Sequence, residues 1–274
     1  MDLKDRLDLK NRLDHLYREI NRPEFIARDP VKFPHRYADK PDREIAAFLA
    51  ATIAWGRRDL ILKSAERMFA LLGPSPHAFV MKGDFRKLVH GGSRESCIRP
   101  SVPGTRGNDY LHRPRGLCIH RTFFEEDLLY FCRGLKNCYV QCESLEALFA
   151  SAENIWEGIA LFRETMAGGN DGRFSKHLAN PHANSACKRL HLALRWLVRR
   201  EGPVDLGLWE SISTSSLFIP LDVHVGRTAR DLGLLEPGRK ANDKKAVIAL
   251  TETLKDFCPE DPVKYDLALF GYSN

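Results

Sequence analysis

Apolar residues recur at the spacing of an α-helix along most of the chain, and this feature constrains its fold most strongly. Leu9, Leu13, Leu16 and Ile20, for example, fall on one helical face. Capping residues and Gly or Pro breaks divide the pattern into segments. We predict helices over 9–20, 43–55, 59–72, 127–133, 144–150, 155–166, 186–200, 223–232, 244–257 and 261–270, with Trp209 on a short helix. No strand series or internal repeat competes with them, so the sequence predicts an all-α protein.

The chain divides at an irregular segment. Its 274 residues allow one large domain or two smaller ones. Between residues 91 and 116, eight of 26 positions are Gly or Pro, and no helical period survives. We therefore predict a helical part over 1–90, a basic insertion over 91–117 and the remainder of the same domain over 118–274. The insertion is expected to be disordered or the product of a reading-frame error, with a loop that contacts nucleic acid as the alternative.

Composition excludes several classes of protein. Hydrophobic residues make up 43% and charged residues 28% of the chain, close to globular averages. The longest apolar run, 45–55, is too short to span a membrane, and the charged N-terminus is unlike a secretory signal, so we expect a cytoplasmic location. The seven cysteines include no CxxC pair, which argues against disulfides, zinc and iron–sulfur clusters. We predict no metal and no cofactor.

One segment concentrates positive charge. The whole chain carries a net charge of +6, but residues 172–200 contain seven Lys or Arg and no Asp or Glu. Such a run can be an ordinary solvated face. Because this one crosses a predicted helix and lacks acids, it can also pair with phosphates. The segment favours a nucleic-acid partner over a helical domain that only binds other proteins.

Lys188 is the candidate nucleophile of this segment. It stands in the first turn of the predicted helix 186–200, on the side that also carries Arg195 and Arg199, away from the apolar face. A lysine near other positive charges or partly removed from water loses its proton more easily and can form a Schiff base. The alternative is an ordinary exposed lysine.

Asp222 is the complementary acid. It follows Pro220 and precedes the predicted helix 223–232, where free backbone amides favour a carboxylate. A fixed carboxylate can stabilise positive charge that develops on a sugar. The alternative is a simple N-cap. His191 and His224 are weaker candidates, because no nucleophile, base and orienting group can be assembled around either of them.

A resemblance joins these residues. The strings CKRLHLALRWLVRR (187–200), PLDVHVGRTARDLGLL (220–235) and DPVKYDLALFG (261–271) resemble an uncharacterised bacterial family that is itself similar to the helix-hairpin-helix (HhH-GPD) DNA glycosylases. The spacing of 34 positions between Lys188 and Asp222 is nearest the archaeal 8-oxoguanine glycosylase branch. The resemblance covers 42–86 and 118–271, and implies two helical subdomains around a cleft.

The resemblance also implies a reaction. Lys188 falls on the Schiff-base lysine and Asp222 on the catalytic aspartate of a base-excision glycosylase, with AP lyase activity possible and an oxidised purine as the candidate lesion. The implied partner is double-stranded DNA with a damaged base, bound by a monomer. Loop 178–187 takes the place of the hairpin but lacks its glycines. The residues expected to contact nucleic acid are Asn184, Ser185, Arg189, Arg195, Arg199 and His224. The alternative is a non-catalytic nucleic-acid-binding module on the same fold.

Overall fold

The computed structural model describes residues 2–86, 88, 116–236, 238 and 242–272, and this part of the chain is mostly helical. The predicted all-α class is confirmed at this level. The α-helices are α1 (Leu3–Ile20), α2 (Pro23–Ala27), α3 (Lys40–Thr52), α4 (Arg58–Leu72), α5 (Pro76–Lys82), α7 (Glu125–Gln141), α8 (Leu145–Ala150), α9 (Ile155–Gly168), α10 (Lys188–Val198), α11 (Val223–Asp231), α12 (Lys244–Lys255) and α13 (Tyr265–Tyr272).

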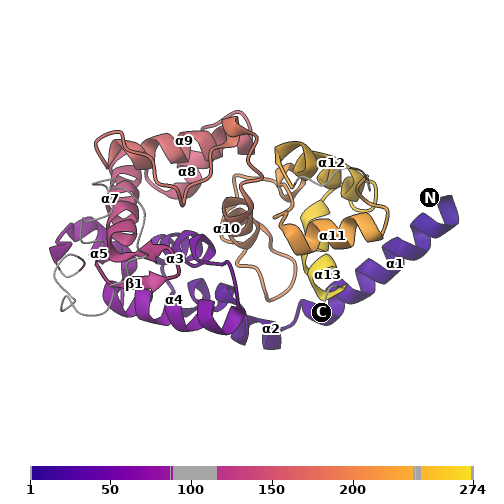
Figure 1. Cartoon of the computed structure of the whole chain (residues 1–274), viewed down its shortest axis with the longest axis horizontal. Coiled ribbons are helices and arrows are strands. Elements are labelled where there is room, and N and C mark those ends of the chain that lie inside the picture. Colours follow the sequence, from indigo (N-terminus) through magenta and orange to yellow (C-terminus); the bar gives the residue numbers. More distant parts are fainter. Residues whose placement is uncertain (1, 87, 89–115, 237, 239–241, 273–274) are drawn as a thin grey trace, which may run out of the picture.

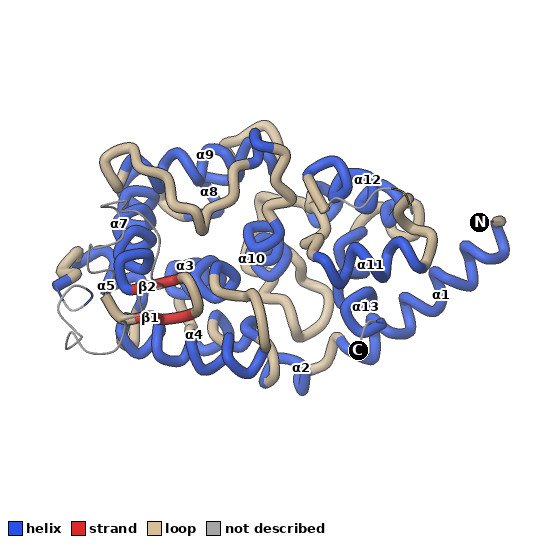
Figure 2. Tube along the Cα trace, viewed as in Figure 1, coloured by secondary structure: helices blue, strands red, loops and turns tan. Residues whose placement is uncertain are grey.

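The described residues also include a small antiparallel β-ladder, which precedes α7 in the chain. Strands β1 (Cys118–His120) and β2 (Phe123–Phe124) pair with His120 opposite Phe123 (Figure 2). Strands of two and three residues are too short to show an alternating pattern, so the sequence analysis did not predict them. Most of the proposed insertion 91–117 lies outside the described residues. No helix in the described ranges is long and apolar enough to cross a bilayer.

Helix α10 lies at the centre of the molecule. Figure 1 shows α3, α4, α5, α7, α8 and α9 on one side of it and α11, α12 and α13 on the other, with α1 leading away from α13. The predicted apolar face of α10 is buried, including Leu190, Leu194 and Leu197. Each such leucine contributes about 2 kcal/mol through burial. The packed helix therefore gives the loops at its two ends a fixed support.

Three local predictions are wrong. Ser185 stands just before the predicted helix 186–200 and is the N-cap that the sequence predicts, but Cys187 occupies that position in α10, with a left-handed backbone (φ 46°). Asp42 stands just before the predicted helix 43–55 and is the N-cap that the sequence predicts there. The helix α3 begins earlier, at Lys40, and the Asp42 carboxylate instead accepts hydrogen bonds from the start of α5. Trp209 lies in a loop and not on a helix, where its indole N–H donates to the buried Glu44.

Candidate active site

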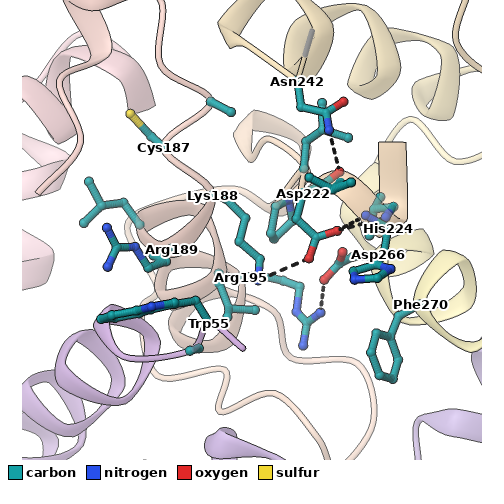
Figure 3. A pocket seen from close by; sticks show the side chains of 18 of the residues that line it. Trp55, Cys187, Lys188, Arg189, Arg195, Asp222, His224, Asn242, Asp266 and Phe270 are labelled. Atoms are coloured by element: carbon teal, nitrogen blue, oxygen red, sulfur yellow. Dashed lines mark hydrogen bonds and ion pairs between the residues drawn. The ribbon is translucent and has the colours of Figure 1, made fainter. Parts of the chain in front are cut away.

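Lys188 and Asp222 meet where two helices begin. Lys188 is the first residue of α10 and Asp222 is the N-cap of α11. The Lys188 Nζ lies 3.5 Å from the Asp222 Oδ2, and the two side chains are 29% and 33% exposed (Figure 3). The sequence analysis expects these groups to approach each other, and the structure shows that they do. Their chemical roles remain a prediction.

The two oxygens of Asp222 face different partners. Oδ1 accepts hydrogen bonds of 2.9 Å from the backbone N–H groups of His224 and Val225, which is the usual N-cap arrangement. Oδ2 faces the ammonium of Lys188. Because the helix end fixes the carboxylate through Oδ1, Oδ2 keeps its direction without help from the lysine. Asp222 is therefore both an N-cap and a candidate reactive group.

A tight loop leads into Lys188. Asn184 has a left-handed backbone (φ 55°), a conformation that asparagine tolerates better than most residues other than glycine. Ser185 Oγ accepts from the Cys187 N–H. Asn184 and Ser185 both line the pocket, so their predicted contacts with nucleic acid stay open to test.

Lys188 and Asp222 line a pocket of about 1350 Å³. Its walls come from the junction of α3 and α4, the starts of α10 and α11, and α13. Four residues with phenyl or indole rings line it: Phe25, Trp55, Trp196 and Phe270. Six arginines also line it: Arg57, Arg58, Arg121, Arg189, Arg195 and Arg227. The Arg58 guanidinium lies 4.5 Å from the centroid of the Phe270 ring, so part of this charge is stacked on an aromatic face.

Two further carboxylates lie around the pair. Asp266 on α13 lines the pocket and pairs with Arg195 (Figure 3). Burial raises the pKa of Asp266 to about 6, and the nearby Asp222 charge acts in the same direction, whereas Arg195 and Lys188 oppose the rise. Burial likewise raises the pKa of Asp29, which lies in the pocket wall and accepts from the Val31 N–H. The surroundings of Lys188 thus mix both signs of charge.

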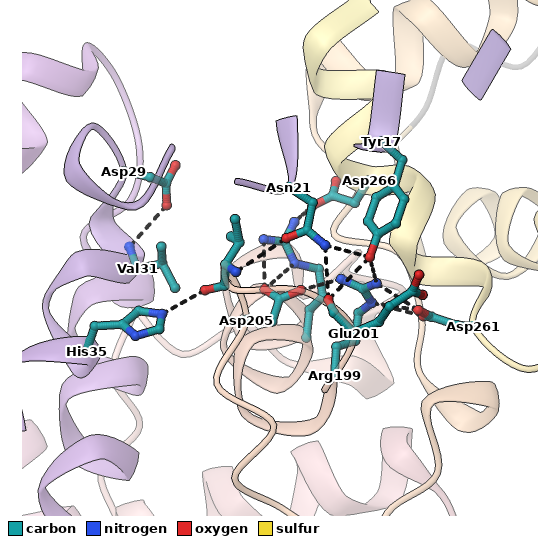
Figure 4. Close-up of polar contacts among 12 residues, drawn as sticks. Tyr17, Asn21, Asp29, Val31, His35, Arg199, Glu201, Asp205, Asp261 and Asp266 are labelled. Carbon is teal, nitrogen blue, oxygen red and sulfur yellow. Dashed lines mark hydrogen bonds and ion pairs between the residues drawn. The ribbon is translucent and has the colours of Figure 1, made fainter. Parts of the chain in front are cut away.

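Arg195 and Arg199 are both buried and paired with carboxylates, and of the two only Arg195 lines the pocket, so their predicted contacts with nucleic acid stay predictions. Arg195 is 3% exposed and pairs with Asp205 and Asp266. Arg199 is fully buried, where its guanidinium binds Asp205 and Asp261 and donates to the Tyr17 hydroxyl (Figure 4). Buried guanidinium groups need such carboxylates, because an unpaired charge in the interior is very costly. The segment 172–200 contains no acid, but acids from later parts of the chain pair with these two arginines in the fold.

The remaining residues that the sequence singles out differ in how far they are buried. Arg189 lines the pocket, but its Nη1 donates to the Thr52 carbonyl and its guanidinium lies 4.9 Å from the Trp55 ring centroid. Burial lowers its pKa. His224 is exposed at the pocket, with a ring nitrogen 3.3 Å from Arg227. His191 is buried against Trp156, outside the pocket lining.

Sequence reasoning missed several pocket residues. It assigned Trp55 to the core, although Trp55 is half-buried and lines the pocket. Its position just before Gly56, at the end of an apolar helix, was an available signal. It passed over Asp266, whose signal was an acid within an otherwise apolar terminal helix. Asn242 also went unnoticed, because it stands alone in a polar loop. Among the described residues, no three His, Cys, Asp or Glu side chains are grouped to hold a metal ion.

The sequence matches one known protein family. A family model described as a protein of unknown function (DUF2400) matches residues 29–99 and 102–274, most of the chain. The chain belongs to the DUF2400 family. No curated protein and no solved structure matches it. The DUF2400 match contains Trp55, Lys188, Asp222 and Asp266, so the pocket lies almost entirely within the sequence that defines the family, and α1 lies before it.

Proposed function

We propose that this DUF2400 protein is a DNA glycosylase of base-excision repair that uses Lys188 as nucleophile and Asp222 as its acidic partner. The observation that carries the proposal is the 3.5 Å approach of Nζ to Oδ2 at the edge of a large pocket. A primary amine is the nucleophile of Schiff-base chemistry, and a carboxylate beside it can accept the proton that the amine must lose. The proposal includes the helix-hairpin-helix glycosylase architecture, with two helical subdomains and the pocket in the cleft between them.

The first step is base removal. Once Lys188 Nζ has given a proton to the Asp222 carboxylate, its lone pair forms a bond to C1′ of the damaged nucleotide. The C1′–N glycosidic bond breaks, and the base leaves with that electron pair and takes up the proton that Asp222 now holds. Positive charge on the sugar peaks as the bond breaks, and the Asp266 carboxylate in the pocket wall favours that state.

The second step is strand cleavage. The C1′–O4′ bond then breaks and opens the sugar ring. O4′ takes one of the two protons on the positively charged Nζ, and a protonated imine remains. The imine acidifies the C2′ hydrogen, so a base removes that proton and the C3′–O bond breaks with release of the phosphate. Water then hydrolyses the imine and restores Lys188. Lyase activity thus follows from an amine nucleophile without a metal ion.

The pocket offers contacts for the nucleotide itself. A base inside a duplex is out of reach of Lys188, so the enzyme must bind it turned out of the stack. The volume of about 1350 Å³ accommodates a nucleotide with its flanking phosphates. Arg57, Arg121 and Arg227 can pair with phosphate oxygens, and the aromatic side chains offer faces for stacking.

The second candidate is a module that binds nucleic acid without chemistry. The arginines around the pocket favour it, because they can pair with phosphates whether or not Lys188 reacts. In that case the arginines around the pocket would still bind DNA, and the Lys188–Asp222 contact would be an ion pair of no catalytic use.

Borohydride trapping separates the two candidates. The protein is incubated with duplexes that carry 8-oxoguanine or an abasic site, reduced, and run on a denaturing gel. We expect a covalent complex with the native protein, none with Lys188→Gln, and a rate lower by about 10²- to 10⁴-fold with Asp222→Asn. Lys63→Gln is the matched control, since Lys63 is exposed on α4 outside the pocket lining. DNA binding without a covalent complex would contradict the enzyme proposal.

A further inference from the structure

A third segment joins the two helix starts that carry Lys188 and Asp222. This segment, Asn242–Lys244, leads into α12, about twenty residues after Asp222. On the side of α11, the Asn242 Nδ2 donates to the backbone carbonyl of Asp222 at 3.1 Å (Figure 3). The same carbonyl accepts the first intrahelical hydrogen bond of α11, from the Gly226 N–H. Asn242 thus contacts the backbone of the candidate acid directly.

The same segment also holds the loop before Lys188. Asp243 Oδ2 accepts from the Asn184 Nδ2 at 2.9 Å, and the Lys244 N–H donates to the Asn184 carbonyl at 3.1 Å. Ser185 and Asp243 form an isolated antiparallel bridge. Two hydrogen bonds and this bridge therefore tie Asp243 and Lys244 to Asn184 and Ser185, just before the start of α10.

The segment is itself firmly supported. Asp243 Oδ1 caps α12 by accepting from the Ala246 N–H at 2.9 Å. Arg230 Nη2 donates to the Asn242 Oδ1 at 2.9 Å. Gly226 makes room for this contact, because a Cβ on it would lie 2.4 Å from the Asn242 Oδ1. Capping α12 uses only the Oδ1 of Asp243. The contact of its Oδ2 with the Asn184 loop and the contact of Asn242 with α11 are therefore not needed for the cap.

We infer that Asn242 and Asp243 are positioning residues that set the separation of Lys188 and Asp222. The inference rests on the proposed function for its catalytic consequence, but the ion pair that it concerns is present without DNA. Asn242 fixes the Asp222 backbone and Asp243 fixes the loop that carries Lys188, so one short segment determines where both begin. A displacement of 1 Å between reacting groups can cost as much as about 10²-fold in rate.

Asn242→Asp is the sharpest test, because it keeps the shape of the side chain and removes the donor to the Asp222 carbonyl. At saturating abasic-site duplex, we expect the single-turnover rate of trapping to fall about tenfold while the Kd for the duplex changes less than twofold. Asn154→Asp is the matched control. Asn154 caps α9 only as an acceptor, a role that aspartate fills equally well, so no loss is expected.

Gly226→Ala tests the same contact from the other side. The added Cβ would lie too close to the Asn242 Oδ1 and displace it. The residues Asn242, Lys188 and Asp222 themselves are not substituted in this variant. Alanine favours a helix more than glycine does, so a simple role in helix stability predicts no loss or a gain. We expect a loss of trapping rate similar to that of Asn242→Asp.

A readout independent of DNA distinguishes failure of this inference from failure of the proposed function. Lys188 is methylated with formaldehyde and borohydride and followed by mass spectrometry, with Lys63 as internal reference. We expect labelling of Lys188 to rise severalfold in Asn242→Asp, because its ion pair with Asp222 loosens. If the native protein traps no DNA but labelling responds, the proposed function fails and the positioning role stands. Unchanged labelling together with an unchanged trapping rate would overturn the inference.

Discussion

Arg199 and Arg200 are neighbours in the chain with opposite environments. The Arg199 side chain is completely buried and binds Asp205 and Asp261, whereas the Arg200 side chain is 55% exposed and lies 3.7 Å from Glu210. The backbone turns between them because α10 ends at Val198 and Arg199 is extended. The two arginines, which look alike in the sequence, should therefore differ greatly in their effect on stability.

Replacing Arg199 with alanine should lower the free energy of unfolding by about 3–5 kcal/mol, because it leaves buried carboxylates without their partner. Arg200→Ala should change it by less than about 1 kcal/mol, as for other exposed pairs. Urea denaturation of both variants measures the difference. If Arg199→Ala fails to fold, Arg199→Lys should still be destabilised, while keeping the salt dependence of DNA binding. Equal stability of the Arg199 and Arg200 variants would contradict the buried network.

Arg227 should contribute to DNA affinity through phosphates. It lines the pocket, is exposed, and follows His224 by one helical turn. Arg227→Gln should reduce the magnitude of the slope of log K against log salt concentration by about one, because one fewer counterion is released on binding. It should weaken binding to all duplexes alike. Fluorescence anisotropy at several salt concentrations measures the slope. Arg18→Gln removes the same charge from the exposed face of α1, outside the pocket lining, and should leave the slope unchanged.

His191 should make the protein sensitive to acid. It is 1% exposed, and within the described residues neither ring nitrogen has a hydrogen-bond partner. Burial lowers its pKa to about 3, and the nearby Lys244 acts in the same direction. The unfolded chain therefore takes up this proton first, near pH 6.5, so His191 favours unfolding progressively as the pH falls from about 6.5 toward 3.

His191→Leu should remove this contribution. Between pH 7 and pH 4.5, the variant should lose about 2 kcal/mol less stability than the native protein. At pH 7 it should be at least as stable, since two buried nitrogens without partners are removed. Denaturation midpoints at the two pH values test this. The same change at the exposed His15 should have no such effect, and identical pH dependence of the native and His191→Leu proteins would argue against a neutral, buried His191.

Periodicity predicted most of the helices, since each buries one apolar face. Leu190, Leu194 and Leu197 indicated the core side of α10 correctly. The ends of the helices were harder to predict because long-range contacts determine them. Asp42, read as a local cap, instead accepts hydrogen bonds from Ser75 and His77, a contact that no local pattern can indicate.

The candidate site was predictable only in part. A lysine and an aspartate at two helix starts pointed to Lys188 and Asp222, with the resemblance supplying their pairing. The sequence could not reveal that Arg195 is buried, because its partners Asp205 and Asp266 come from a later loop and the last helix. Charge counted along a segment measures neighbours in sequence, whereas burial brings together charges that are far apart.

Mass spectrometry of the reduced protein–DNA complex tests the central claim most directly. After trapping on an abasic-site duplex, the complex is digested with nuclease and protease, and the modified peptide is sequenced. We predict a single modified residue, Lys188, carrying the reduced sugar on Nζ, with the intensity lost in Lys188→Gln. Modification of another lysine or of the N-terminal amine, with Lys188 unmodified, would contradict the assignment of the nucleophile and with it the account of the pocket.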